Sequence, residues 1–205
     1  MDAPLVRDLG LRPLPEVSAE MQAFTAERTA ASRDEVWFVE HPPVYTLGMR
    51  ADRSHLLAPG NIPVVQIDRG GQVTYHGPGQ LVAYVLLNLE RRALTPRKLV
   101  QALENAVIDT VADYGVVATA RRDAPGVYVE GAKLAAVGLR VKRHCSYHGL
   151  AVNVAMDLAP YQGINPCGYE GLAVTDLRTL CGVDSLERFR SDFQPRLLAR
   201  LATSY

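Results

Sequence analysis

The chain has 205 residues, 48% of them hydrophobic and 21% charged, which predicts one globular domain spanning residues 1–205. Its 22 basic and 22 acidic side chains cancel, so the charge gives no reason to expect a nucleic acid partner. An odd number of cysteines, no secretory signal pattern and no apolar stretch near the ~20 residues of a membrane span predict a cytoplasmic protein without disulfides or a membrane partner.

The first half of the chain alternates short apolar runs with one helical pattern. Residues 15–33 predict a helix, because Val17, Met21, Phe24 and Arg28 recur at helical spacing. The runs of β-branched and apolar residues predict strands at residues 4–10, 36–39, 44–47, 62–67 and 81–89.

A glycine-rich segment, residues 69–80, lies between the last two of these strands. Four glycines surround Thr74-Tyr75-His76, and glycine lets a backbone approach a ligand closely. We therefore expect a ligand-binding loop, although a tight β-turn with a structural Gly-Pro is the alternative. The segment does not end in Gly-Lys-Ser/Thr and a strand follows it, so it is not a phosphate-binding loop.

The second half begins with the clearest helix, residues 96–114, with Thr95 as N-cap and Gly115 at its end. Strands are predicted at residues 116–120, 126–129, 133–141 and 146–154, with a hairpin turn at Glu130-Gly131. Thr175 and Asp184 are expected to cap two final helices, the second with Pro195 as a kink. Mixed strands and helices predict an α/β (α+β) fold with a mixed, mostly antiparallel sheet and flanking helices.

Cys167 is the first candidate for chemistry. It stands in Asn165-Pro166-Cys167-Gly168, where proline and glycine favour an exposed, turned backbone. A nearby cation raises the thiolate fraction of such a cysteine, and a thioester stores an acyl group that still reacts with an amine. The alternative is a buried cysteine that acts as a small hydrophobic residue.

Lys133 is the second candidate. It follows the Glu130-Gly131 turn and is surrounded by small and apolar residues. If it faces inward with Ala135 and Val137, its charge requires a partner or a function. A desolvated lysine can act as a base, and its cation favours a thiolate. The alternative is an edge-strand lysine that points to water.

The histidines give weaker signals. His144, Cys145 and His148 have poor spacing for zinc, so no metal site is expected. If residues 146–154 form a strand, His148 shares a face with Leu150, Val152 and Val154 and is better explained as a hydrogen-bonded histidine near the core. His41 and His76 each follow a strand, and the sequence does not assign them a role.

Three motifs resemble the bacterial lipoyl(octanoyl) transferases, the octanoyl-acyl-carrier-protein:protein octanoyltransferases. They are residues 69–80, residues 131–140 followed by 148–154, and Ile164-Asn165-Pro166-Cys167-Gly168. The resemblance covers nearly the whole chain from Glu40 onward. Ala135-Ala136-Val137 lacks the serine associated with this family, which puts one side-chain contact in doubt.

The resemblance implies the fold of the biotin/lipoate protein ligase catalytic domain, with Cys167 as the acyl-thioester residue and Lys133 completing a Cys/Lys dyad. It also implies a substrate pocket. The residues expected to line it are Arg69, Gly70, Gly71, Gln72, Val73, Thr74, Tyr75, His76, Ala136, Val137, Gly138, Gly149, Leu150 and Ala151.

The function implied is transfer of an octanoyl or lipoyl group from acyl carrier protein to a lysine of a lipoyl domain, in a 2-oxoacid dehydrogenase E2 subunit or glycine-cleavage H protein. We expect a monomer that needs no cofactor or metal. Three alternatives stay open: an ATP-dependent lipoate- or biotin-protein ligase of the same fold, an amidotransferase that moves octanoyl between proteins, and a non-catalytic module that binds acyl-carrier or lipoyl domains.

Overall fold

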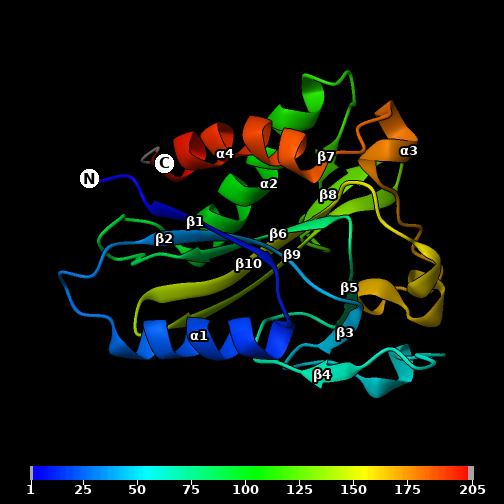
Figure 1. The fold of residues 1–205 in the computed structure, drawn as a ribbon, viewed down its shortest axis with the longest axis horizontal. Coiled ribbons are helices and arrows are strands. Elements are labelled where there is room, and N and C mark those ends of the chain that lie inside the picture. The colour runs from blue at the N-terminus through cyan, green and yellow to red at the C-terminus, as the bar shows by residue number, and fades with distance from the viewer. Residues whose placement is uncertain (1, 203–205) are drawn as a thin grey trace.

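The computed structural model describes residues 2–202, which form two sheets flanked by helices (Figure 1). The larger sheet has seven strands in the order β1-β2-β6-β10-β9-β8-β7. Their bounds in that order are Leu5–Leu11, Glu35–Glu40, Gln80–Leu86, Cys145–Asn153, Ala132–Lys142, Gly126–Val129 and Thr119–Ala120. β1 and β2 pair in parallel and the other neighbours are antiparallel. The predicted mixed, mostly antiparallel sheet is therefore confirmed.

The smaller sheet is formed by β4 (Val64–Gln66), β3 (Val44–Leu47) and β5 (Val73–His76), in that order. β5 lies inside the glycine-rich segment, where a loop was expected. That expectation is wrong for these four residues, which pair antiparallel with β3. Valine, threonine and tyrosine favour an extended strand, and the glycines lie on either side of it.

Helices cover both faces of the larger sheet (Figure 1). α2 (Pro96–Ala112) and α4 (Leu186–Ala202) pack on one face, where Leu99, Leu103 and Phe193 belong to the main core. α1 (Leu14–Glu27) lies on the other face, and its Val17 and Met21 belong to a second core cluster. Short 3₁₀ turns occur at Arg53–His55, Ala159–Gly163 and Pro166–Gly168. Between residues 2 and 202, no helix has the length and apolar character needed to cross a bilayer.

The end of α1 differs from its prediction. The helix stops at Glu27, because Arg28 turns to an extended backbone and its guanidinium pairs with the buried Asp34. In the segment that follows, the Ser32 hydroxyl accepts a hydrogen bond from the backbone N–H of Thr29, an interaction that competes with helix.

The caps of the last two helices each lie one residue later than predicted. Asp176, not Thr175, caps α3 (Leu177–Cys181) by accepting from the Thr179 N–H at 2.9 Å. Ser185, not Asp184, accepts from the N–H of Arg188 at the start of α4. These residue types all make good caps, so composition alone does not choose between neighbours.

Candidate active site

Lys133 and Cys167 meet although 34 residues separate them. The Lys133 Nζ lies 2.8 Å from the Cys167 Sγ. Lys133 is the second residue of β9, after a turn in which Glu130 and Gly131 have positive φ. The pairing of β8 with β9 shifts at this point, so Leu134 is an extra residue and both Leu134 and Ala135 enter the main core. Such a bulge re-aims neighbouring side chains, and Lys133 is directed to Cys167.

The surroundings of Lys133 favour its ammonium. The side chain is only 4% exposed, and its Nζ lies 5.1 Å from the centre of the Tyr128 ring. Burial lowers the pKa of Lys133, but the Cys167 thiolate and Tyr128 raise it more, so the net shift is upward. The neighbours of Lys133 therefore outweigh the burial that alone would favour a neutral lysine.

Glu104 of α2 is a buried carboxyl group near this pair. Its Oε1 accepts a hydrogen bond from the backbone N–H of Gly126 at 2.8 Å. A Cβ added to Gly126 would lie 3.5 Å from the Lys133 Nζ, so Gly126 separates the carboxylate from the ammonium. Burial raises the pKa of Glu104, whereas the Gly126 N–H and Lys133 lower it. Sequence reasoning missed this residue, because one glutamate in an amphipathic helix does not stand out.

Cys167 lies in a tight turn and is half-buried. Its φ of 57° and ψ of 17° are left-handed, a strained conformation for a residue other than glycine. The turn is anchored by the Asn165 N–H, which donates to the carbonyl of His55 at 2.9 Å. A Cβ on Gly168 would lie 3.2 Å from both the His55 ring and the Gln72 side chain, so glycine is needed for this packing. The predicted turned backbone is present, and the thiol is partly accessible.

A narrow cavity of about 50 Å³, here called the slot, opens beside Cys167. All but two of the residues expected to bind substrate line it; Gly70 and Tyr75 do not. Tyr75 projects from the other face of β5 and packs against Tyr45 and Tyr161. Ile67, Val82, Tyr84 and His148 line the slot without having been predicted to do so.

Arg69 and His76 bring polar groups to the slot wall. The Arg69 Nη2 donates to the carbonyl of Thr46 at 2.8 Å, and burial lowers the pKa of Arg69 to about 10. The His76 Nδ1 lies 2.7 Å from the Gln80 Oε1, and burial lowers the pKa of His76 to about 3. At neutral pH the slot therefore has a buried cation and a neutral imidazole.

His41 and His148 hold two tyrosines near the slot. The His41 Nε2 lies 2.7 Å from the Tyr84 hydroxyl, and burial lowers the pKa of His41. His148 is buried and hydrogen-bonded as expected, with its Nε2 2.8 Å from an oxygen of Asp68. The predicted face was wrong: His148 has φ 59°, which interrupts the strand alternation, and its ring contacts Tyr84 and Tyr147. His148 therefore lines the slot itself, whereas His41 is hydrogen-bonded to Tyr84, which lines it.

Comparison with known proteins identifies the family. A family model described as "Lipoyl protein ligase A/B catalytic domain" matches residues 14–201. The chain belongs to this family. It is 56% identical over 196 residues to a protein named Octanoyltransferase from Pseudomonas entomophila, covering 96% of this chain and 91% of that protein. A second Octanoyltransferase, from Thiobacillus denitrificans, is 56% identical over 95% of this chain and 90% of its own length.

Solved structures of lipoate and biotin protein ligases share the fold at low sequence identity. Lipoate-protein ligase A bound with ATP superposes with a TM-score of 0.81 at 13% identity, over 98% of this chain and 86% of that one. A putative lipoate protein ligase from T. acidophilum with bound lipoic acid gives 0.78, also at 13% identity, with the same coverage. Biotin protein ligase from Aquifex aeolicus in complex with biotin and ATP gives 0.59 at 13% identity, over 97% of this chain and 70% of that one. The implied biotin/lipoate ligase fold is confirmed.

Proposed function

We propose that this enzyme is an octanoyltransferase of protein lipoylation, which carries the acyl group on Cys167 between two proteins. The observation that carries the proposal is the 2.8 Å contact between the Lys133 Nζ and the Cys167 Sγ at the slot. A ligase that activates a free acid with ATP needs no nucleophilic thiol, whereas a transfer that passes through an acyl-enzyme uses one. The names of the relatives agree with the transferase.

The donor in this proposal is octanoyl-acyl carrier protein. The Cys167 thiolate attacks the thioester carbonyl carbon, and the new C–S bond replaces the bond to the carrier sulfur. That sulfur leaves with a proton from the Lys133 ammonium, so the enzyme is left with an octanoyl-cysteine and a neutral lysine. The octanoyl chain occupies the slot, where each buried methylene contributes ~0.8 kcal/mol. Because the slot has a volume of only about 50 Å³, it must widen to admit eight carbons.

The second step uses a change in Lys133 that follows from its surroundings. A thiolate at Cys167 makes the largest contribution to raising the pKa of Lys133, and acylation removes that charge. Burial then dominates and lowers the pKa of Lys133. The lysine therefore becomes a base only after the cysteine has been acylated.

The acceptor is a lysine of a lipoyl domain, in a 2-oxoacid dehydrogenase E2 subunit or glycine-cleavage H protein. Its ammonium gives one proton to Lys133, and the resulting amine attacks the octanoyl-cysteine. The C–S bond breaks, an amide forms, a second proton goes to water, and the thiolate–ammonium pair is restored. This order of steps predicts ping-pong kinetics.

The free cysteines at 145, 167 and 181 fit the proposed cytoplasmic, reducing location.

Incubation with octanoyl-acyl carrier protein tests the proposal. We expect an octanoyl adduct by intact mass, mapped to Cys167 by peptide analysis and absent from Cys167→Ala. Transfer to an unmodified lipoyl domain should then release the adduct without ATP. The ligase alternative would be correct if Cys167→Ala modified the lipoyl domain at the normal rate with free octanoate and ATP.

A further inference from the structure

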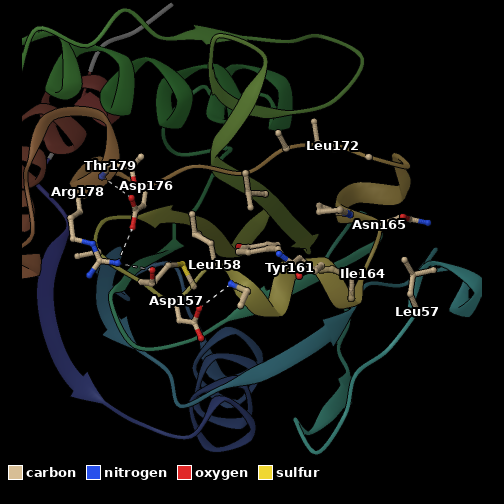
Figure 2. Close-up of a pocket in the computed structure, with 18 residues that line it drawn as sticks. Leu57, Asp157, Leu158, Tyr161, Ile164, Asn165, Leu172, Asp176, Arg178 and Thr179 are labelled. Atoms are coloured by element: carbon tan, nitrogen blue, oxygen red, sulfur yellow. Dashed lines mark hydrogen bonds and ion pairs between the residues drawn. The ribbon is translucent and has the colours of Figure 1, made fainter.

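A second cavity, of about 890 Å³, lies beside the Cys167 turn and is here called the trench (Figure 2). It runs between residues 155–166 on one wall and residues 171–179 on the other. Leu57 and Asn165 lie at one end, and Asp157, Asp176 and Arg178 lie at the other. The octanoyl chemistry proposed above uses the slot and leaves the trench without a ligand.

Both walls of the trench adjoin the Cys/Lys dyad. Pro166 lines the trench, and the next residue, Cys167, lines the slot. On the other wall, Val174 forms a parallel bridge with Lys133. The bridge consists of the Lys133 N–H donating to the Ala173 carbonyl at 2.8 Å and the Thr175 N–H donating to the Lys133 carbonyl at 3.1 Å. A segment lying in the trench would therefore pass close to the acyl-cysteine.

The Val174 wall has an open backbone edge. The Ala173 carbonyl and the Thr175 N–H both bond to Lys133 of β9. Because consecutive residues of an extended segment direct their backbone polar groups to opposite edges, the N–H and carbonyl of Val174 face away from β9. Across residues 2–202, neither group has a backbone hydrogen-bond partner. Unpaired edge groups of this kind accept an extended peptide as an added strand. A polypeptide segment satisfies both groups, whereas an aliphatic chain does not.

The charge of the trench favours a cationic occupant. Asp157, Asp176 and Arg178 are the charged residues of its lining, which gives 1 − 2 = −1. Asp176 is 1% exposed, and its Oδ2 has no hydrogen-bond partner, with the Arg178 Nη2 3.7 Å away. Because these residues lie at the end of the trench away from Asn165, they favour positive charge along the acceptor segment rather than at the lysine that reacts with Cys167.

We propose that the trench binds the acceptor protein, as an extended lysine-bearing segment paired with the Val174 edge. This inference rests on the proposed function for the identity of the acceptor. It divides the two substrates between the two cavities: the acyl chain enters the slot, and the receiving backbone lies in the trench. Val174 and Asp157 are then determinants of acceptor recognition that act only in the second step.

Two substitutions, the first with a matched control, test this division. Val174→Pro removes the free N–H and leaves the Ala173 and Thr175 bonds to Lys133 possible, while Val174→Thr keeps the N–H. Asp157→Asn removes a charge, and its side-chain oxygen can still accept from the Ala159 N–H. Octanoyl-enzyme is prepared first, and its deacylation is followed with an unmodified lipoyl domain and, separately, with hydroxylamine. Hydroxylamine is too small to need the trench.

For Val174→Pro, we expect transfer to the lipoyl domain to fall about 5–10-fold relative to release by hydroxylamine, the loss of one hydrogen bond. Val174→Thr should keep the ratio of transfer rate to hydroxylamine release close to that of wild type, and Asp157→Asn should lower this ratio about threefold. If the Pro variant does not fold, the Asn variant decides. An unchanged ratio in both variants overturns the proposal, as does slowing confined to formation of the octanoyl adduct, which would assign the trench to the donor.

A binding measurement keeps this test separate from the proposed function. Titration of Cys167→Ala with the lipoyl domain requires no chemistry, and both trench variants should weaken the affinity in that background. Absence of any octanoyl adduct in the wild type would refute the transferase mechanism. Weakened binding would still support the trench in that case, and unchanged binding would refute it.

Discussion

Replacing Lys133 with methionine removes the cation beside Cys167 while roughly preserving side-chain length. At the observed 2.8 Å, two unit charges attract by ~1.5 kcal/mol at the dielectric constant of water and by ~6 kcal/mol at an effective constant of about 20. Because Cys167 is half-buried, the interaction lies between these limits. The lower limit alone corresponds to a ~10-fold weaker stabilisation of negative charge that develops on the Cys167 sulfur.

Alkylation by iodoacetamide at pH 7, with peptide mapping, measures this loss. The rate at Cys167 should fall ~10-fold or more in Lys133→Met, and the rate at the buried Cys145 provides an internal reference in each sample. Octanoyl-adduct formation should slow in parallel. A Cys167 alkylation rate within about twofold of wild type would refute the view that the ammonium sustains the thiolate.

Lys133→Arg separates the two roles assigned to the lysine. Arginine keeps the positive charge, so alkylation should be largely retained. The octanoyl-enzyme should still form, because the carrier sulfur can leave as a thiolate and take its proton from water. It cannot release its proton near neutral pH, so it cannot act as the base in the second step. The octanoyl-enzyme should accumulate and transfer slowly. Transfer at the wild-type rate in this variant would show that another group takes the acceptor proton.

Three further substitutions test other parts of the structure. Glu104→Gln keeps an acceptor for the Gly126 N–H and removes a charge that attracts the Lys133 ammonium. The high-pH limb of the profile of transfer rate against pH should therefore move to lower pH, and a profile that coincides with wild type would contradict this. Asp34→Asn leaves three arginines around a neutral group and should lower the free energy of unfolding by ~3–5 kcal/mol in urea titrations. Burial raises the pKa of Asp34 in the folded state, but bonds to the Asn88 N–H and the arginines lower it more, so the net shift is downward. The contribution of Asp34 to the free energy of unfolding is therefore complete above a pH of about 4 and is lost as the pH falls through the folded-state pKa. Gly149→Ala would bring a Cβ within 1.9 Å of the Ala83 carbonyl oxygen and should lower stability by ~1–3 kcal/mol, measured as a lower Tm.

Sequence patterns predicted the strands and helices better than their ends. The hairpin of β8 and β9 followed from Glu130-Gly131, and α2 followed from its stripe of leucines and valines and its Thr95 cap. The end of α1 depended on the attraction of Arg28 to Asp34, a tertiary contact that helical spacing cannot reveal. The strand β5 was missed because its neighbouring glycines dominated the local composition.

The slot residues show why a contiguous motif overstates a site. The family resemblance assigned all of residues 69–76 to the substrate pocket, but a strand directs alternate side chains to opposite faces. Tyr75 therefore packs away from the slot, while Thr74 and His76 line it. Tyr84 lines the slot from β6, where apolar residues on both faces gave no signal of which face is functional. The bulge at Leu134 depends on pairing with β8 and has no local sequence marker.

The strained turn at Cys167 lies between the slot and the trench. A left-handed residue between Pro166 and Gly168 reverses the chain within three residues, so consecutive side chains line the trench and the slot. A residue other than glycine in this conformation costs on the order of 1 kcal/mol, and the Asn165–His55 hydrogen bond helps to hold it. An acyl chain bound in the slot would then present its thioester between the two cavities. An acceptor amine could approach from the trench without displacing the chain, which is the geometry that a two-step transfer requires.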